Sequence, residues 1–154
     1  MKRNFDFHVH SNVSDGSFAP GDLVRAAAGE GIEFLAITDH DTVSGVAEAV
    51  EAGKEAGVVV IPGLEISIEF GPGTFHLCGY GIDIENGKLR SALDFVQEER
   101  KNRNDLIIAR LNGIGVMVTM AEVRAVAGAD QVGRPHFAKV IIAGGYAETF
   151  QGIC

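Results

Sequence analysis

The sequence has no run of about 18 apolar residues, so no segment is expected to cross a membrane as a helix. Basic residues are scarce: 13 Lys and Arg stand against 21 Asp and Glu, giving a formal net charge of −8. This balance argues against a protein that binds DNA or RNA non-specifically. Only two cysteines occur, Cys78 and Cys154, and they form no metal-binding pair. Cys78 lies in an apolar strand, so we expect it to be a small buried thiol. Residues 1–6 lack the apolar segment of a secretory signal, so we expect a cytoplasmic protein.

The composition is otherwise that of a globular chain with a core. Apolar residues make up 46% of the 154 positions and charged residues 22%, which excludes a disordered chain. Over the first 80 residues, short apolar strands alternate with amphipathic helices, and this order predicts an α/β fold with a parallel sheet or barrel. A Pro-Gly pair at 62–63 is expected to break the third apolar run into two strands. The expected strands are 5–10, 34–38, 58–61, 64–70 and 74–80, and the expected helices are 20–30 and 44–56.

The pattern changes after residue 84. A long amphipathic helix is predicted over 89–111, and it carries several basic residues that a solvated helix face would also explain. Thr119 and Glu122 have the spacing of a capping box, which predicts a short helix after them. A last helix is expected to begin at Pro135. We therefore expect an N-terminal sheet part over 1–84 and a helical subdomain over 85–154.

The first strand carries a pair of histidines. His8 and His10 lie two positions apart and should project from one face, with Phe7 and Val9 packed on the opposite face. Two imidazoles at the end of a strand suit a divalent transition metal. Asp15 follows in a Ser-Asp-Gly turn that can fold back over the strand end. For this pair alone, the alternative is an ordinary strand that carries two histidines.

Further candidate ligands follow the later strands. His40 comes directly after the second strand, and Glu65 and His76 lie in the strands after that. In βα folds the functional side chains gather at the carboxyl ends of the strands, so these residues should meet His8 and His10 at one edge. Taken singly, His40 could be a hydrogen-bonded loop residue, His76 a core histidine and Glu65 a solvent-facing carboxylate.

The candidate set contains imidazoles and carboxylates but no thiolate. This donor chemistry favours Zn²⁺, Mn²⁺ or Fe²⁺ over a cysteine-rich structural zinc site. The set exceeds the four ligands of one tetrahedral ion, so we expect a cluster of two or three ions, with Glu65 bridging two of them. Asp39 and Asp41 flank His40, and we expect them to orient imidazole rings. The candidate metal ligands are His8, His10, Asp15, His40, Glu65 and His76.

Arg134 and His136 flank the proline at the start of the last expected helix. A guanidinium beside the free N–H groups of a helix N-terminus forms a natural phosphate site. A surface arginine and a helix-capping histidine would have the same spacing, so the residues alone leave both interpretations open.

Five segments resemble, in order along the chain, the PHP (polymerase and histidinol phosphatase) family. They are FHVHSNVSDG, AITDHDTV, IPGLEIS, HLCGYGID and GRPHFA, and the resemblance runs from residue 5 to about residue 150. Within the family the sequence is most similar to the nucleoside 3′,5′-bisphosphate phosphatases, a branch that includes 5′-to-3′ exoribonucleases. Five motifs in family order make the resemblance specific.

The resemblance implies a distorted (βα) barrel with a trinuclear site, commonly of manganese, iron or zinc, and an inserted helical cap. It places the six candidate ligands at metal positions, and Arg134 and His136 at positions in the cap that hold phosphate. The implied reaction is hydrolysis of a phosphomonoester of a nucleotide or of an RNA 5′ end by metal-bound hydroxide. Mn²⁺ is the expected ion, with Fe²⁺ or Zn²⁺ as alternatives.

The family pattern also predicts more strands than this sequence contains. It continues beyond the cap with another histidine and a terminal Asp-X-His pair, whereas the sequence stops at Cys154. A complete βα barrel normally takes about 250 residues. We therefore expect a partial barrel with an uncovered face. Three alternatives follow: the N-terminal part of a longer product, a barrel completed by a second copy, or a metal-binding fragment with little catalysis. An amide hydrolase on a related barrel is a weaker hypothesis.

Overall fold

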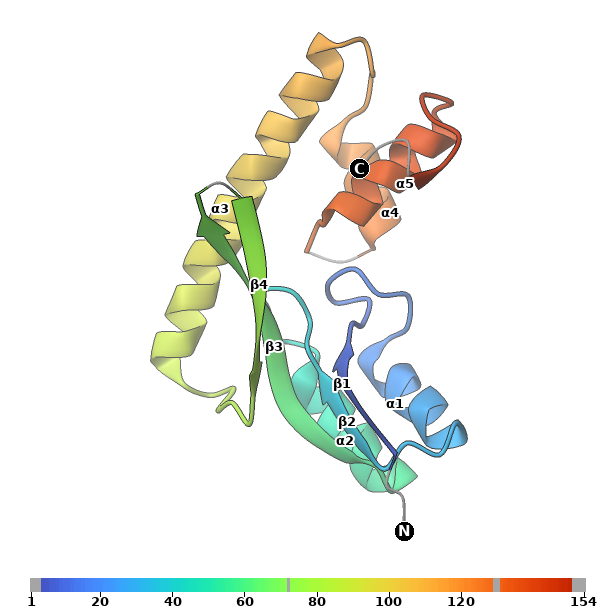
Figure 1. The fold of residues 1–154 in the computed structure, drawn as a ribbon, viewed down its shortest axis with the longest axis vertical. Coiled ribbons are helices and arrows are strands. Elements are labelled where there is room, and N and C mark those ends of the chain that lie inside the picture. The colour runs from blue at the N-terminus through green and yellow to red at the C-terminus, as the bar shows by residue number, and fades with distance from the viewer. Residues whose placement is uncertain (1–3, 72, 129–130, 151–154) are drawn as a thin grey trace.

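Two β-α-β units build the lower part of the molecule (Figure 1). The computed structural model describes residues 4–71, 73–128 and 131–150. Strands β1 and β2 are parallel neighbours, as are β2 and β3, and the connecting helices α1 and α2 lie on one face of the sheet. The α/β class predicted from the sequence is confirmed. The elements are β1 (Phe5–Val9), α1 (Pro20–Gly29), β2 (Phe34–Ile37), α2 (Val46–Ala56) and β3 (Val59–Phe70).

Strand β3 changes partner along its length. Its first residues pair in parallel with β2, and from Gly63 onward it pairs antiparallel with β4 (Gly73–Tyr80). The strand order is therefore β1-β2-β3-β4. The break expected at Pro62 is wrong. The strand runs through because the change of partner falls there, and Gly63 admits close flanking strands: a methyl group on it would lie 2.8 Å from Ile37 O and 3.0 Å from Gly79 O.

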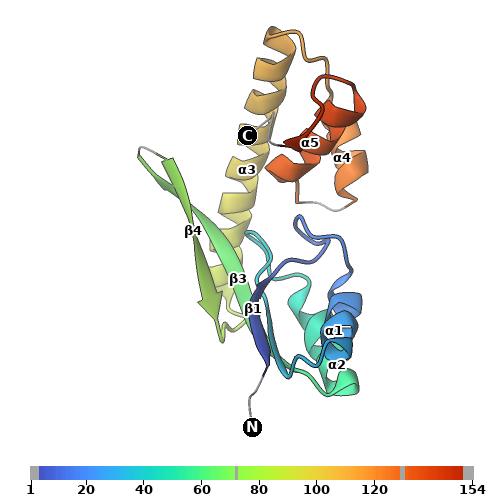
Figure 2. The ribbon, with the colours of Figure 1, turned by 45° about the vertical axis from the view of Figure 1, so that its right-hand side comes forward.

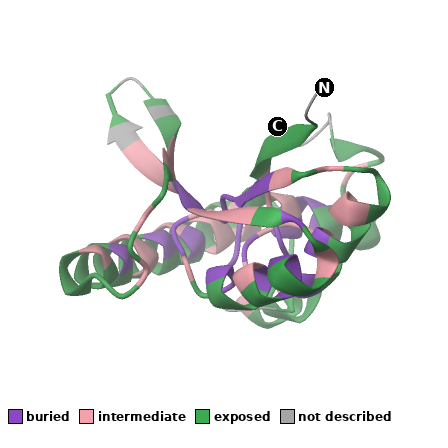
Figure 3. Ribbon diagram, turned by 90° about the horizontal axis from the view of Figure 1, so that it is seen from below, coloured by how far each residue is buried: buried purple, intermediate pink, exposed green. Residues whose placement is uncertain are grey.

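The first core lies between the sheet and helices α1 and α2. Leu35 and Ile37 of β2 are fully buried there, and Figure 3 shows this buried centre in purple. Val9 packs against this core, but Phe7 does not, which corrects the expectation that both would. The pairing of β1 with β2 shifts register between Asp6 and Val9, and Phe7 instead stacks on Phe5 with ring centroids 4.9 Å apart.

Three further helices follow the sheet: α3 (Gly87–Gly113), α4 (Met120–Ala127) and α5 (Arg134–Ala143). The lower part of α3 runs beside the β3–β4 hairpin, and its upper part runs beside α4 and α5 (Figures 1 and 2). The capping box of Thr119 and Glu122 is confirmed at the start of α4. A second core joins these helices, with Val123, Phe137 and Ile141 buried in it. In the described part of the chain, no helix is long and apolar enough to cross a membrane.

Candidate metal centre

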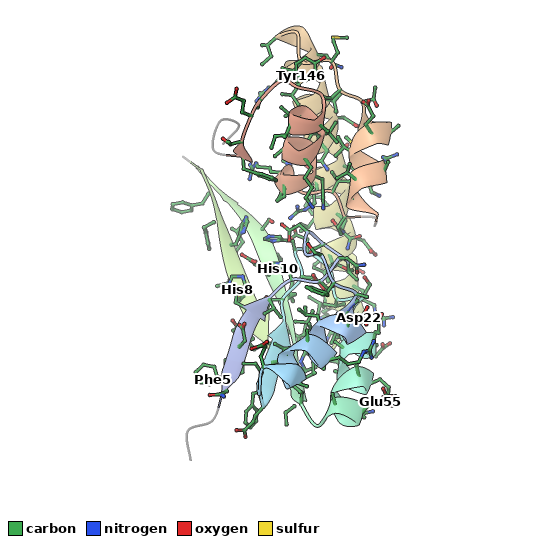
Figure 4. All side chains as sticks on the ribbon, turned by 90° about the vertical axis from the view of Figure 1, so that its right-hand side faces the viewer. Phe5, His8, His10, Asp22, Glu55 and Tyr146 are labelled. Atoms are coloured by element: carbon green, nitrogen blue, oxygen red, sulfur yellow. The ribbon has the colours of Figure 1, made fainter. Side chains whose placement is uncertain are left out.

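Four histidines meet at the end of the sheet where the parallel strands finish. His8 and His10 come from the end of β1, and Figure 4 shows both beside the loops that follow the strands. His40 lies just after β2 and forms an isolated parallel bridge with Glu65 of β3. His76 comes from β4, where it faces Ser67 across the hairpin. The structure thus brings together residues that are up to 68 positions apart in the sequence.

Glu65 lies at the centre of this group. Its side chain is only 7% exposed, and one oxygen, Oε2, lies 2.9 Å from His8 Nε2 and 3.0 Å from His10 Nε2. The other oxygen, Oε1, lies 2.9 Å from His76 Nδ1. His40 Nδ1 is 3.6 Å from Oε2. One buried carboxylate therefore faces all four imidazoles, with its two oxygens shared between them.

Asp15 closes the group on the side of the loop after β1. Its carboxylate oxygens lie 3.5 Å from His10 Nδ1 and 3.7 Å from His40 Nε2. Three sets of donors have their ligand atoms within 4.8 Å of one another, and neighbouring sets share residues. These sets are His8, His10 and Glu65; His10, Asp15 and His40; and His40, Glu65 and His76.

Two ring nitrogens in this group are buried without a hydrogen-bond partner among the described residues: His10 Nδ1 and His40 Nδ1. A buried polar atom without a partner normally costs free energy, so such atoms require a reason. A divalent ion would supply the missing partner, and imidazole and carboxylate are the donors that Zn²⁺, Mn²⁺ and Fe²⁺ accept. The residues present therefore fit a metal centre.

The electrostatics of the group favour the protonation states that bind metal. Burial lowers the pKa of His40 and outweighs the opposing charges of Asp15 and Glu65. Burial alone would raise the pKa of Glu65, but the hydrogen bond with His8 and the charges of His40 and His10 outweigh it, so the pKa falls below its ordinary value. A neutral imidazole and an ionised carboxylate are the states in which these groups coordinate a cation.

Among the described residues, neither Asp39 nor Asp41 hydrogen-bonds an imidazole ring, which corrects the expectation that they would orient the rings directly. Asp39 accepts hydrogen bonds from Ser11 N at 2.7 Å, Ser11 Oγ at 2.6 Å and Ser14 Oγ at 2.7 Å. It therefore fixes the loop that carries Asp15. Asp41 is bound to β3 and α3 instead. Both carboxylates are already occupied by other donors. Ser11 and Ser14 bind Asp39, and Ser67 and Arg100 bind Asp41.

Arg134 and His136 lie at the start of α5, beside the loop that carries Asp15. A methyl group on Gly133 would be 3.6 Å from Asp15 Cβ, which places the helix N-terminus against that loop. His136 is 2% exposed, and its Nδ1 accepts a hydrogen bond from Gly133 N at 3.0 Å. The ring proton of neutral His136 is therefore on Nε2. Burial and the charge of Lys139 lower the pKa of this ring.

A further arginine near Arg134 was not singled out in the sequence. Arg103 of α3 is half-buried, and within the described part of the chain its guanidinium donates to Asn104 Oδ1 alone, at 2.9 Å and 3.3 Å. Burial, together with the charges of Arg100 and Arg134, lowers the pKa of Arg103 to about 10. Among the described residues, neither Arg103 nor Arg134 has a carboxylate within ion-pair distance. The sequence placed Arg103 on a basic helix face, and only the packing of α3 against α5 distinguishes it from its neighbours there.

Comparison with known proteins gives one family and several relatives. A family model described as the PHP domain matches residues 6–127. The chain is 33% identical over 143 residues to a 3′,5′-nucleoside bisphosphate phosphatase of Chromobacterium violaceum, and 33% identical over 142 residues to a 5′-3′ exoribonuclease of Haemophilus influenzae. Each match covers 92% of this chain, but only 50% and 52% of the relatives.

A solved structure has the same arrangement. It is described as an amidohydrolase from Chromobacterium violaceum with bound sulfate and no metal, and it superposes with a TM-score of 0.89 at 30% identity. The match covers 97% of this chain and 53% of that one. The chain thus spans about half the length of these relatives, and its four-stranded sheet corresponds to a partial barrel of the same fold.

Proposed function

The chain belongs to the PHP domain family, and on that premise we propose that it is a metal-dependent phosphoesterase acting on a nucleotide phosphomonoester. The observation that carries the proposal is Glu65, a buried carboxylate with three imidazole nitrogens within 3.0 Å. Two further ring nitrogens in the group are buried and have no hydrogen-bond partner among the described residues. The proposed ligands are His8, His10, Asp15, His40, Glu65 and His76. We propose two or three ions, with Mn²⁺ ahead of Fe²⁺ and Zn²⁺.

When bound, such a metal cluster lowers the pKa of a water molecule and neutralises charge on a phosphoryl group. The chain's own residues position the metal donors. Glu65 and Asp15 hold the ring nitrogens of the four histidines in place. The loop that carries Asp15 is itself fixed by Asp39 through Ser11 and Ser14. The donors are thus set by packing before a ligand arrives.

The phosphate is proposed to bind where the start of α5 meets α3. Arg134 and Arg103 supply guanidinium groups with no acidic partner among the described residues. The N-terminal end of the α5 dipole faces the same place, although Pro135 has no N–H and the N–H groups of Gly133 and His136 are already bonded within the turn. His136 donates from Nε2, because Gly133 N occupies its Nδ1. These cationic donors support a phosphate ester over an amide. The nucleoside bisphosphate phosphatase and exoribonuclease relatives support a nucleoside 3′,5′-bisphosphate or an RNA 5′ end as the substrate.

The test is phosphate release from a nucleoside 3′,5′-bisphosphate and from a 5′-phosphorylated oligoribonucleotide, after loading with Mn²⁺, Fe²⁺ or Zn²⁺ in turn. We expect metal-dependent release, lost in Glu65→Gln and reduced in Arg134→Ala and Arg103→Ala. Arg110→Ala is the matched control, since Arg110 is an exposed residue of the same helix α3 as Arg103. Bound metal without release from either substrate would contradict the phosphoesterase proposal.

One observation supports a second candidate function, a metal-binding chain that acts through self-association. Phe5 and Tyr80 are 62% and 49% exposed, and Phe7 lies between them with ring centroids 4.9 and 6.2 Å away. Contiguous exposed aromatics typically mark a contact surface. Light scattering on a size-exclusion column tests this: a dimer that Phe7→Ser returns to a monomer would support it, and a wild-type monomer would exclude it.

A further inference from the structure

Asp41, which directly follows His40, has an unusual backbone conformation. Its φ is 55°, and among the described residues it is the only non-glycine with a positive φ. L-residues rarely adopt this left-handed region unless their surroundings hold them there. The turn sits between β2 and the candidate ligand His40 on one side and helix α2 on the other. The contacts of Asp41 therefore help to set the position of His40.

The side chain of Asp41 is fully buried and bound on every side. Oδ1 accepts from Ser67 N at 2.7 Å, and Oδ2 accepts from Ser67 Oγ at 2.9 Å. Oδ2 also accepts from Arg100 Nε at 2.9 Å and from Arg100 Nη2, which in turn donates to Ser67 Oγ at 2.9 Å. Arg100 is itself buried, with 9% of its side chain exposed.

The backbone of Asp41 is held by the same elements. Asp41 N donates to Glu65 O at 2.9 Å, so the turn is joined directly to the central carboxylate residue. Asp41 O accepts from Gln97 Nε2 at 2.9 Å. Gln97 and Arg100 lie three positions apart on α3 and so share one face of that helix.

Together these contacts connect α3 to both His40 and Glu65. Ser67, two residues after Glu65 on β3, is bound to Asp41 through its backbone and its side chain. The same helix also carries Arg103, about one turn after Arg100, and Arg134 lies at the start of α5. Seating α3 against the sheet therefore sets the spacing of two candidate ligands.

We propose that Arg100 is a positioning residue for the metal centre: its ion pair with Asp41 holds the turn that sets His40 against Glu65. The proposal rests on the proposed function, because it assumes that these residues bind metal. Arg100 places three N–H contacts on two acceptors. Lysine has a single ammonium on a flexible chain and cannot reproduce that planar arrangement. Arginine is thus required, and a positive charge alone is insufficient.

The test measures metal binding by Arg100→Lys and Gln97→Leu, with Co²⁺ as the probe. Lys101→Met is the matched control, because Lys101 is the next residue on α3 and its ion pair is with exposed Glu98. The Co²⁺ absorption spectrum reports ligand geometry, and a titration gives affinity. We expect both variants to bind Co²⁺ about 10–100-fold more weakly, the range for residues that orient ligands. We also expect altered spectra, and Lys101→Met to match wild type.

Thermal unfolding of the metal-free proteins separates positioning from simple support. If Arg100→Lys lowers the unfolding temperature yet binds Co²⁺ with the wild-type affinity and spectrum, then Arg100 only stabilises the fold, and the proposal is overturned. Gln97→Leu removes a single neutral hydrogen bond, so it keeps the test valid if Arg100→Lys does not fold. A wild-type chain that binds no Co²⁺ would overturn the proposed function itself, an outcome distinct from unchanged variants of a chain that binds.

Discussion

Glu65→Gln should remove metal binding while leaving the chain folded. Glutamine has nearly the same size and shape as glutamate. It carries no charge, and an NH₂ group that cannot coordinate a metal replaces one carboxylate oxygen. In the structure both oxygens are engaged, Oε2 with His8 and His10, and Oε1 with His76. Either orientation of the glutamine therefore takes an acceptor away from at least one imidazole. Residues that only orient ligands contribute about 10–100-fold to affinity, so loss of this carboxylate should cost at least about 100-fold.

Thermal unfolding with and without metal measures the loss of metal affinity in Glu65→Gln. At a metal concentration about 100 times the wild-type Kd, binding stabilises the native state by about 2.7 kcal/mol. For a chain of this size that corresponds to a rise of about 5–11 °C in the unfolding temperature. In the variant the same concentration would be no greater than Kd, which leaves about 0.4 kcal/mol and a shift of about 1–2 °C.

The matched control is Glu51→Gln, since Glu51 is an exposed residue of α2 that pairs with Lys54. It should keep the full metal-dependent shift. A cooperative unfolding transition in metal-free Glu65→Gln would show that the variant folds. If Glu65→Gln retained the wild-type shift, the reasoning that places this carboxylate at the centre of the metal site would be refuted.

The remaining predictions concern stability. Leu35→Ala should lower the free energy of unfolding by about 2–5 kcal/mol in urea titrations, because Leu35 is 1% exposed in the first core; a loss well below 1 kcal/mol would contradict that packing. Gly63→Ala should lower the unfolding temperature sharply, because its methyl group would lie 2.8 Å from Ile37 O, whereas Gly79→Ala has 3.7 Å of clearance; equal effects would argue against the strand crossing at Gly63. Burial lowers the pKa of His136 below its ordinary value of 6.5, so the unfolded chain binds a proton at a higher pH than the folded chain does. The free energy of unfolding should therefore fall as the pH drops below 6.5, and His136→Gln should make this fall less steep. An unchanged pH dependence in the variant would assign the effect to other groups.

The sequence predicted the features that depend on local pattern and on strand order. Alternating apolar strands and amphipathic helices predicted the α/β fold, and the fold then brought His8, His10, His40 and Glu65 to one edge. The physical reason is general, since parallel strands end at the same edge of a sheet. The roles of these residues as metal ligands, and a boundary between subdomains at residue 84, stay predictions.

The features that the sequence did not predict depend on distant contacts. Asp41 was expected to orient an imidazole, but its partner Arg100 lies 59 positions away on a helix whose docking no local pattern reveals. In the sequence, Arg103 cannot be distinguished from the solvent-exposed basic residues of its helix. Its burial near Arg134 depends on how α3 packs beside α5. Pro62 reads as a strand break unless the change of partner along β3 is known.

The expectation about Cys78 is wrong. Cys78 was expected to be a buried thiol, but it is only half-buried, because β4 is an edge strand with one paired neighbour. Cys154 lies outside the described residues.

The central claim is that the histidines around Glu65 bind divalent metal. Elemental mass spectrometry on the size-exclusion peak of the folded chain, after exposure to Mn²⁺, Fe²⁺ or Zn²⁺ and removal of free ions, tests it most directly. The account predicts two or three ions per chain, falling toward zero in Glu65→Gln. A folded wild-type chain that retains no ion under any of these conditions would contradict it.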